Sequence, residues 1–553
     1  MPSRRILLRW LALLGALILL ALPALAAPPT VRTAPKLVVV VSVDQLSAER
    51  MMALAPRFTG GLARLLKEGV VFDRAYHAHA GTETGPGHSV LLSGKHPGHT
   101  GIPENEWFDP ALGHEVYCVE DPLNPVLGHP AMGASPRNFR AHTLGEWLRA
   151  ANRDNRSFAV TGKDRSAILM AGRQADGVYW WDPAVGFTTS AFYAPALPAW
   201  LQAHNTQLMA DLQARTLVWE ALDGKAHEVA DFGPVGRLLP WGLPKPIKVA
   251  GQDMTKAGLF NASPFFDRAI LEAAEALIAA EKLGRGRGTD LLALGLSATD
   301  YIGHRFGNGG PEMEDQLRRL DFLLEGFLKR VKALDPKALV VLSADHACGD
   351  FPERLQAEGK LPRDRAFRLD PVATVLRPLN AHLRERFGLS ADPLLRASDP
   401  RNLSFDGALL QAAKVDRAAV AQAASAWMKA QPFVLESVPA AELATLPMDS
   451  LQGRDPEGLT MKERLRLSLT PGLGGEVISA FAPHILFIPP SFTATHGSPH
   501  DYDRHVPLIF WGPLRAHRVA QPVSTVDLAP TLAGALGLAV PEPVDGLRRD
   551  LRP

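Results

Sequence analysis

The stretch KLVVVVSVD at residues 36–44 is a continuous run rich in β-branched residues that ends in a carboxylate. A run without polar alternation is typical of a strand that is buried on both faces of a parallel sheet. Similar apolar runs occur at residues 291–296, 338–342 and 506–511, and helical periodicity separates them, most clearly over residues 265–283. Because strands alternate with helices, we predict an α/β fold whose mostly parallel sheet is flanked by helices.

The composition of the 553-residue chain limits the class of protein. With 46% hydrophobic and 21% charged residues, it excludes disordered, collagen-like and coiled-coil proteins. Two stretches interrupt the alternation of strands and helices: residues 110–140 are rich in Pro and Gly, and residues 367–475 are helical with short strands. We therefore predict one catalytic domain over residues 36–553, with residues 367–475 as an inserted cap subdomain that covers the site.

The first 26 residues have the three parts of a secretory signal peptide. Arg4, Arg5 and Arg9 precede a leucine-rich run, and the run ends in the small-residue pattern of residues 24–26. We predict cleavage after this pattern and a periplasmic protein, exported by the Sec or the twin-arginine route; an uncleaved anchor is the alternative. No second long apolar run follows, so we expect no stable membrane anchor after cleavage.

Charge and cysteine content restrict the partners and the source of stability. Removal of residues 1–26 changes the formal net charge from +1 to −2, and this balance gives no sign of a nucleic-acid partner. The two cysteines, Cys118 and Cys348, permit at most one disulfide, so the fold cannot depend on a disulfide framework. One bridge and two free thiols are both compatible with the sequence.

Most side chains of the metal-ligand type come just after the predicted strands. Open α/β sheets bind their ligands at this carboxyl end of the strands. Asp300 and His304 lie one helical turn apart, so both can reach the same ion. Taken singly, each of these residues has an ordinary role as a cap, a surface pair or a solvated loop residue. Together, three carboxylates and three imidazoles suit two zinc-type cations, which would relieve the repulsion between the acids. The six residues are Asp44, Asp300, His304, Asp345, His346 and His496.

Thr84 opens the run TGPGHSVLL, residues 84–92, which predicts a helix that starts at or just after this threonine, with Pro86 near its first position. The ordinary role of such a threonine is an N-cap. A hydroxyl there also lies at the positive end of the helix dipole, beside free N–H groups that favour a phosphoryl oxygen. If a metal ion also contacts Thr84, its alkoxide becomes accessible near neutral pH.

The ordered set of the Thr84 run and the six ligand-type residues resembles the bimetallic alkaline phosphatase superfamily, and within it the periplasmic threonine-nucleophile alkaline phosphatases of Gram-negative bacteria. The resemblance extends from about residue 36 to the helix start at residues 526–531. It implies that one zinc ion is held by Asp300, His304 and His496. It further implies that the second is held by Asp44, Asp345 and His346, and that Thr84 contacts this second ion.

The resemblance also implies three side chains that bind the phosphoryl group, namely Asn105, Lys163 and Arg165. Residues two apart on an extended segment point to the same side, so we expect Lys163 and Arg165 to face the pocket and Asp164 to point away and pair outside it. The planar fork of an arginine can hold two phosphoryl oxygens, and a lysine adds a point charge. Without the resemblance, a solvated strand face would be the ordinary interpretation of this segment.

These residues predict a hydrolase, namely a secreted alkaline phosphatase with two Zn²⁺ per chain that releases inorganic phosphate through a phosphothreonine. A phosphate monoester carries more negative charge than a diester, so two extra cations and an amide donor favour small-molecule phosphate monoesters as substrates. We expect a monomer. The alternatives are a phosphodiesterase or nucleotide pyrophosphatase of the same superfamily, and a non-catalytic zinc-binding periplasmic protein. A sulfatase is disfavoured because the Thr84 run lacks the Cys/Ser-x-Pro-x-Arg context of that chemistry.

Overall fold

The computed structural model describes residues 34–553, except residues 110–111, 215–218, 220–221, 223–246, 250–251, 255–259, 396–397 and 488–493. The predicted signal peptide at residues 1–26 lies outside the described residues. Among the helices that are described, none combines the length and the apolar character needed to cross a membrane.

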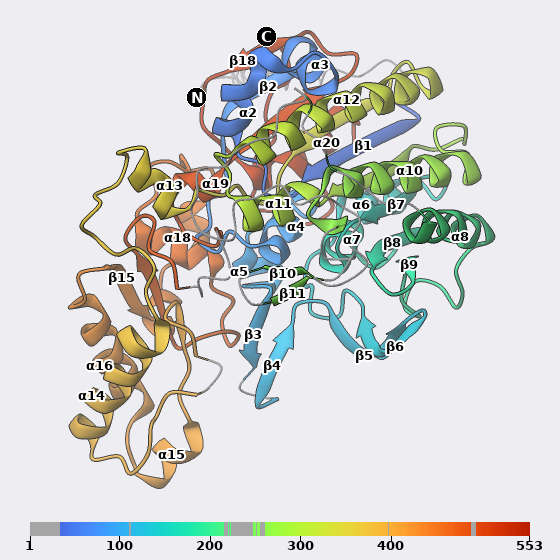
Figure 1. The fold of residues 1–553 in the computed structure, drawn as a ribbon. Coiled ribbons are helices and arrows are strands. Elements are labelled where there is room, and N and C mark those ends of the chain that lie inside the picture. The colour runs from blue at the N-terminus through green and yellow to red at the C-terminus, as the bar shows by residue number, and fades with distance from the viewer. Residues whose placement is uncertain are drawn as a thin grey trace, which may run out of the picture.

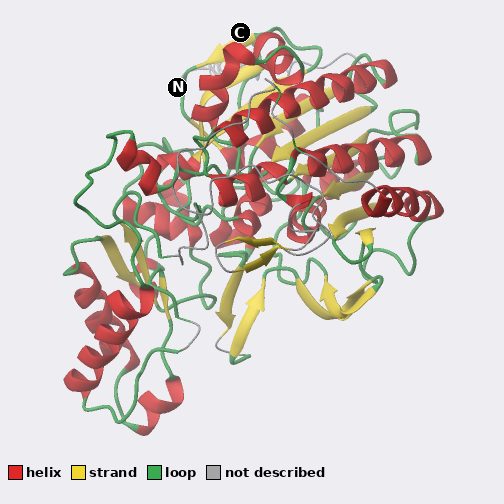
Figure 2. Cartoon of the chain, viewed as in Figure 1, coloured by secondary structure: helices red, strands yellow, loops and turns green. Residues whose placement is uncertain are grey.

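A mixed, mostly parallel sheet forms the centre of the molecule, as Figure 2 shows. Its strands are β1 (Leu37–Val43), β2 (Val70–Tyr76), β7 (Arg156–Thr161), β8 (Gly177–Asp182), β9 (Gly186–Thr188), β12 (Asp290–Leu296), β13 (Leu339–Ser343), β17 (His505–Trp511), β18 (His517–Val519) and β19 (Val523–Ser524). Within the described residues their order is β18-β2-β17-β13-β1-β12-β7-β8-β9, and β19 also pairs with β2. Strand β17 runs antiparallel to β13 and β2, and β9 runs antiparallel to β8. The four predicted strand runs are β1, β12, β13 and β17, and the predicted fold class is confirmed.

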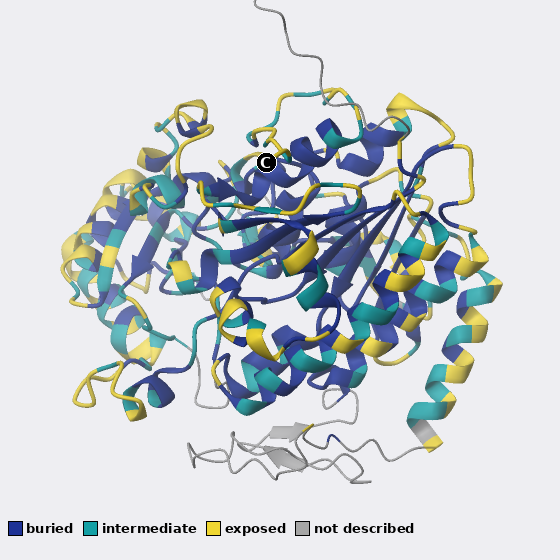
Figure 3. Ribbon diagram, turned by 90° about the horizontal axis from the view of Figure 1, so that it is seen from above, coloured by how far each residue is buried: buried dark blue, intermediate teal, exposed yellow. Residues whose placement is uncertain are grey.

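Burial on both faces explains the continuous apolar run of β1. Its odd-numbered valines pack into one core with α2 (Ala48–Leu54), α3 (Gly61–Glu68), α10 (Pro264–Ala280), α11 (Ala298–Phe306) and α12 (Pro311–Leu334). Val38 and Val40 pack into a second core with α4 (Thr84–Leu91), α6 (Leu144–Ala151), α7 (Asp164–Ala171) and α20 (Leu528–Ala535). Figure 3 shows the buried strands between helices whose outer faces are exposed. The predicted helix at residues 265–283 is α10, which ends earlier than predicted because Lys282 adopts a positive φ.

Two hairpins project from the body in Figure 1, and most of their residues lie in the Pro- and Gly-rich stretch at residues 110–140. They pair β3 (Glu106–Asp109) with β4 (His114–Tyr117), and β5 (Glu120–Val126) with β6 (His129–Ala134). The other elements outside the cap are η1 (Ala55–Arg57), α5 (Pro97–Thr100), α8 (Ala199–Ala214), β10 (Ile247–Val249), β11 (Gln252–Met254), α13 (Pro352–Ala357), α19 (Asp501–Arg504) and η4 (Thr525–Asp527).

A smaller lobe, yellow to orange in Figure 1, contains most of the predicted cap. Its antiparallel sheet has the order β14 (Asn402–Leu403), β16 (Val477–Phe481), β15 (Val434–Pro439). Its apolar core includes Val375, Leu379 and Phe405. The central strand β16 lies beyond residue 475, so the packed unit continues past the predicted end of the cap, while the division into domains stays a prediction. The other elements of the predicted cap are η2 (Val372–Leu376), α14 (Arg377–Phe387), α15 (Gly407–Ala412), α16 (Arg417–Lys429), α17 (Ala440–Leu443), η3 (Met448–Leu451) and α18 (Met461–Ser468).

Candidate active site

Three neighbouring parallel strands bring the predicted acids together. Asp44 follows β1, Asp300 lies in the first turn of α11 just after β12, and Asp345 follows β13. Strand β1 pairs with β12 on one side and β13 on the other, and the Asp44 backbone N–H donates to the Leu296 carbonyl at 2.9 Å. The carboxyl ends of these strands therefore meet at one edge of the sheet, where α/β folds bind ligands.

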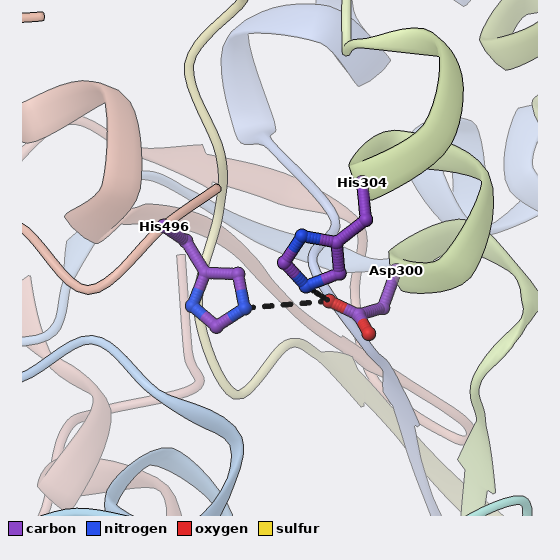
Figure 4. A group of neighbouring side chains, drawn as sticks. All are labelled: Asp300, His304 and His496. Atoms are coloured by element: carbon purple, nitrogen blue, oxygen red, sulfur yellow. Dashed lines mark ion pairs between the residues drawn. The ribbon is translucent and has the colours of Figure 1, made fainter. Parts of the chain in front are cut away.

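The first ligand-type group combines a helix and a distant loop, as Figure 4 shows. Asp300 and His304 lie on α11, and His496 comes from the loop before α19. The Asp300 Oδ1 atom is 3.3 Å from His304 Nε2 and 3.5 Å from His496 Nε2. One ligand atom from each side chain lies within 4.8 Å of the others, a spacing at which the three can hold one cation.

The second group lies directly beside the first and is fully buried. His346 Nε2 is 3.5 Å from Asp44 Oδ1 and 3.4 Å from Asp345 Oδ2. The rings of His346 and His496 stack with their centroids 3.7 Å apart, so the two groups share one wall. Ligand atoms of Asp44, Asp345 and His346 also lie within 4.8 Å of one another. All six predicted ligand residues are therefore brought together in the two predicted trios.

Hydrogen bonds to the backbone fix the orientation of the three imidazoles. The Nδ1 atoms of His304, His346 and His496 lie 3.0, 3.0 and 2.7 Å from the carbonyl oxygens of Ala494, Ala347 and Thr82. Because a carbonyl can only accept, Nδ1 carries the proton in each ring and Nε2 presents its lone pair to the carboxylates. Each Nε2 lone pair and the carboxylate oxygens beside it repel one another. A cation placed between them would be coordinated by both, so the donor set fits two cations that prefer nitrogen and oxygen ligands.

The buried carboxylates compete for positive charge. Burial raises the pKa of Asp44 well above its ordinary value, and nearby Asp345 adds to this shift, although Lys163 opposes it. At Asp300 burial also acts to raise the pKa, but the ammonium of Lys163 leads the opposing effects, which hold the pKa well below its ordinary value. The ammonium of Lys163 bridges the two groups, with Nζ 2.7 Å from Asp44 Oδ2 and 2.6 Å from Asp300 Oδ2. One lysine cannot neutralise three carboxylates, and further cations would stabilise the site.

Thr84 is the first residue of α4, after the N-cap residue Glu83, and its side chain is buried beside both groups. Its Oγ1 atom lies 3.4 Å from Lys163 Nζ and 3.3 Å from Arg165 Nη2. Asn105 lies close by, since its Oδ1 accepts from the backbone N–H of Gly85 at 2.7 Å. This bond fixes the amide so that Nδ2 points away from Gly85. Thr84, Asn105 and Arg165 line a cavity of about 450 Å³ together with Asp300, His304 and His496.

A family model described as type I phosphodiesterase / nucleotide pyrophosphatase matches residues 38–378. The chain belongs to this family. It is 35% identical over 541 residues to alkaline phosphatase PhoK of Sphingomonas sp, with 94% of this chain and 91% of PhoK covered. It is 29% identical to alkaline phosphatase PafA of Elizabethkingia meningoseptica, with 92% of each chain covered. A crystal structure of PafA matches with a TM-score of 0.80 at 27% identity, covering 92% of this chain and 96% of the other.

Membership of the type I phosphodiesterase / nucleotide pyrophosphatase family confirms the predicted superfamily, that of the alkaline phosphatases. It also confirms the predicted enzyme class, a hydrolase of phosphoric esters. The chain covers nearly the whole length of both named relatives, so the likeness includes the cap as well as the sheet.

The local structure predicted for Lys163 and Arg165 is wrong, although both side chains reach Thr84. Strand β7 ends at Thr161, Lys163 is the N-cap residue of α7, and Arg165 lies in the first turn of that helix. Both side chains reach the same hydroxyl because the start of α7 packs beside α4, not because they alternate along a strand. Lys163 also pairs with the carboxylates of both ligand groups, which the prediction did not include.

Asp164 pairs with Tyr117, and neither residue lines the cavity that Thr84 shares, in agreement with the expected pairing of Asp164 outside the pocket. Its Oδ1 accepts a hydrogen bond from the Tyr117 hydroxyl at 2.6 Å. The same hydroxyl oxygen accepts from Arg165 Nη1 at 3.2 Å. Tyr117 on β4 therefore holds the Arg165 guanidinium toward Thr84, and sequence reasoning missed it because the hairpin lies far from α7 in the chain.

Gln45 is a second residue that the sequence did not single out. Its backbone N–H donates to Asp345 Oδ1 at 3.1 Å, and its Nε2 donates to Asp300 Oδ1 at 2.9 Å. Its φ is 68°, which is unusual for a residue with a side chain and is typical of strained functional sites. The one available signal was its position directly after Asp44.

Cys118 and Cys348 are both buried free thiols.

Proposed function

We propose that the protein is a zinc-dependent phosphate monoesterase that forms a phosphothreonine at Thr84 and releases inorganic phosphate. The observation that carries the proposal is one buried hydroxyl beside two groups of carboxylates and imidazoles, within 3.4 Å of Lys163 Nζ and 3.3 Å of Arg165 Nη2. A structural metal site has no need of a hydroxyl with two cationic side chains around it.

The two groups would each hold one ion. Asp300, His304 and His496 would hold the first, and Asp44, Asp345 and His346 the second, with Thr84 as a further ligand of the second. When bound, two zinc-type ions supply Lewis acidity that lowers the pKa of a bound hydroxyl and stabilises a leaving alkoxide. The backbone bonds to the three Nδ1 atoms keep the Nε2 atoms available for this role.

The side chains of the chain itself orient and neutralise the phosphoryl group. Thr84 Oγ1 attacks phosphorus as the bond to the leaving alkoxide breaks, and water then cleaves the phosphothreonine to give inorganic phosphate. The fork of Arg165, held by Tyr117, can bind two non-bridging oxygens. Asn105 Nδ2, whose direction is set by the bond of Oδ1 to Gly85, donates to a third oxygen.

Phosphate monoesters are the proposed substrates, and the alternative is a phosphodiesterase or nucleotide pyrophosphatase. The names of the relatives PhoK and PafA support a phosphatase, whereas the name of the family model fits the alternative. The variants Lys163→Ala and Arg165→Ala separate the two. We expect them to lower monoester turnover far more than diester turnover, and equal losses would contradict the assignment.

The proposal includes export to the periplasm, by the Sec or the twin-arginine route, and action as a monomer. The support for export is the signal-like pattern of residues 1–26. Cell fractionation of the expressed full chain tests the location, and size-exclusion chromatography with light scattering tests the oligomeric state.

Metal analysis of the purified protein, coupled to a phosphate-release assay, tests the function. We expect two zinc ions per chain in the wild type and nearly complete loss of release in Thr84→Ala. A wild type that binds zinc but hydrolyses no ester would support the non-catalytic alternative. Full activity of Thr84→Ala would exclude the phosphothreonine.

A further inference from the structure

Arg401 links the cap to the segment that carries the nucleophile. It directly precedes β14, and its carbonyl oxygen accepts from the backbone N–H of Ser479 on β16 at 2.8 Å, so its backbone is fixed to the cap sheet. Its guanidinium reaches out of the cap, and Nη1 donates to Glu83 Oε1 at 2.8 Å. Glu83 is the N-cap residue directly before Thr84.

Glu83 connects Arg401 to Asn105, because its two carboxylate oxygens have different partners. While Oε1 pairs with Arg401, Oε2 accepts from the backbone N–H of Asn105 at 2.9 Å. The Asn105 side chain in turn accepts from Gly85 at 2.7 Å, which closes a ring of hydrogen bonds.

The ring fixes Asn105 at two points, its backbone nitrogen and its side-chain oxygen. A side chain anchored at both points has one direction left for its Nδ2 donor, toward the cavity that Asn105 shares with Thr84. Removal of Arg401 would leave the largely buried Glu83 side chain without its ion-pair partner, and such a group moves toward water or another donor. The backbone of Asn105 would then lose its fixed acceptor.

We infer that Arg401 is a positioning residue that acts through Glu83 to keep the Asn105 amide in its position beside Thr84. The inference rests on the proposed function, which gives Asn105 its role at the phosphoryl group. It assigns the cap a part in the chemical step beyond covering the site. The competing explanation is that the ion pair only fastens the cap to the body.

The variant Arg401→Met tests the inference, with Arg417→Met as its matched control. Arg417 also lies in the cap and pairs with a glutamate, Glu476, through Nη2 at 2.8 Å, but that pair does not touch Glu83 or Asn105. We expect Arg401→Met to lower kcat/KM for a phosphate monoester about 10-fold, within the range that misplaced catalytic groups cost. Arg417→Met should stay within about 2-fold of the wild type, since it removes a similar surface pair.

A double-mutant cycle with Asn105→Ala separates positioning from fastening. If Arg401 acts through Asn105, Arg401→Met in the Asn105→Ala background should lower kcat/KM by less than about 2-fold. A second full 10-fold loss would show that Arg401 acts independently of Asn105 and would overturn the inference. An effect of Arg401→Met no larger than that of Arg417→Met would overturn it as well.

Two further measurements keep the outcomes distinct. If Arg401→Met fails to fold by circular dichroism, Arg401→Lys replaces it, because this variant keeps the charge and loses the fork; we expect a smaller loss that again disappears with Asn105→Ala. A wild type without monoesterase activity overturns the proposed function and the inference together. An active wild type with an impaired Asn105→Ala variant supports the function and leaves the cycle to decide the inference.

Discussion

Gly87 provides a direct test of how closely Thr84 must approach the second ligand group. A Cβ atom at this position of α4 would lie 1.9 Å from the backbone carbonyl oxygen of Asp345, whereas real Cβ contacts are essentially never shorter than 3.0 Å. In Gly87→Ala the start of α4 and the segment at Asp345 must therefore separate by at least about 1 Å. A displacement of this size between reacting groups costs about 100-fold in rate, and overpacking costs about 1–3 kcal/mol of stability.

The assay is kcat/KM for a phosphate monoester, measured together with the zinc content and the denaturant midpoint. Gly326→Ala is the matched control, because a Cβ at this position of α12 meets no atom within 4 Å. Alanine favours a helix over glycine by about 1 kcal/mol, so the control should be neutral or slightly more stable, with unchanged activity. If Gly87→Ala keeps activity and stability within the error of the wild type, the close approach of α4 to Asp345 is wrong.

Three further perturbations have expected outcomes. Tyr117→Phe removes the hydroxyl that holds Arg165 and should lower kcat/KM about 10-fold, the rate equivalent of one lost hydrogen bond, with little change in zinc content. Burial lowers the pKa of His77 to about 4, so between about pH 6.5 and 4 the unfolded chain binds a proton that the folded chain does not. The free energy of unfolding should therefore fall by about 3 kcal/mol as the pH falls through this window, and this loss should be absent from His77→Gln in matched denaturation curves. Chelation of the metal should abolish phosphate release and lower the midpoint of thermal unfolding, and zinc should restore both, because a ligand that binds only the folded state stabilises it; full activity in excess chelator would contradict the proposal.

The strands and most of the ligand-type residues could be predicted because their signals are local, whereas the division of these residues into two groups came from the family resemblance. The run at residues 36–44 is apolar at successive positions since both faces of β1 are covered, and Asp44 follows at the end where ligands bind. The same signal could not give direction: residues 506–511 look alike, but β17 runs antiparallel. The role of His496 came from the family resemblance, because a loop histidine has no periodicity to mark it.

The contacts that could not be predicted join segments far apart in the chain. Tyr117 and Arg401 act on residues more than 40 positions away, and no spacing rule relates them. The error at Lys163 has a different cause. A short polar segment between a strand and a helix can be assigned to either, and here Asp164 begins α7. In both cases the missing information is the packing of one segment against another.

The balance of charge connects the site to the proposed substrate. In the proposed complex, Asp44, Asp300 and Asp345, the Thr84 alkoxide and a monoester dianion would carry six negative charges. Two divalent ions with Lys163 and Arg165 would carry six positive ones. A buried site favours such neutrality, whereas a diester monoanion would leave one positive charge unbalanced. Arg165→Gln should therefore lower the ratio of monoester to diester turnover, and Arg165→Lys, which keeps the charge, should preserve more of it. Equal losses in the two variants would mean that the geometry of the guanidinium fork, and not its charge, sets the preference.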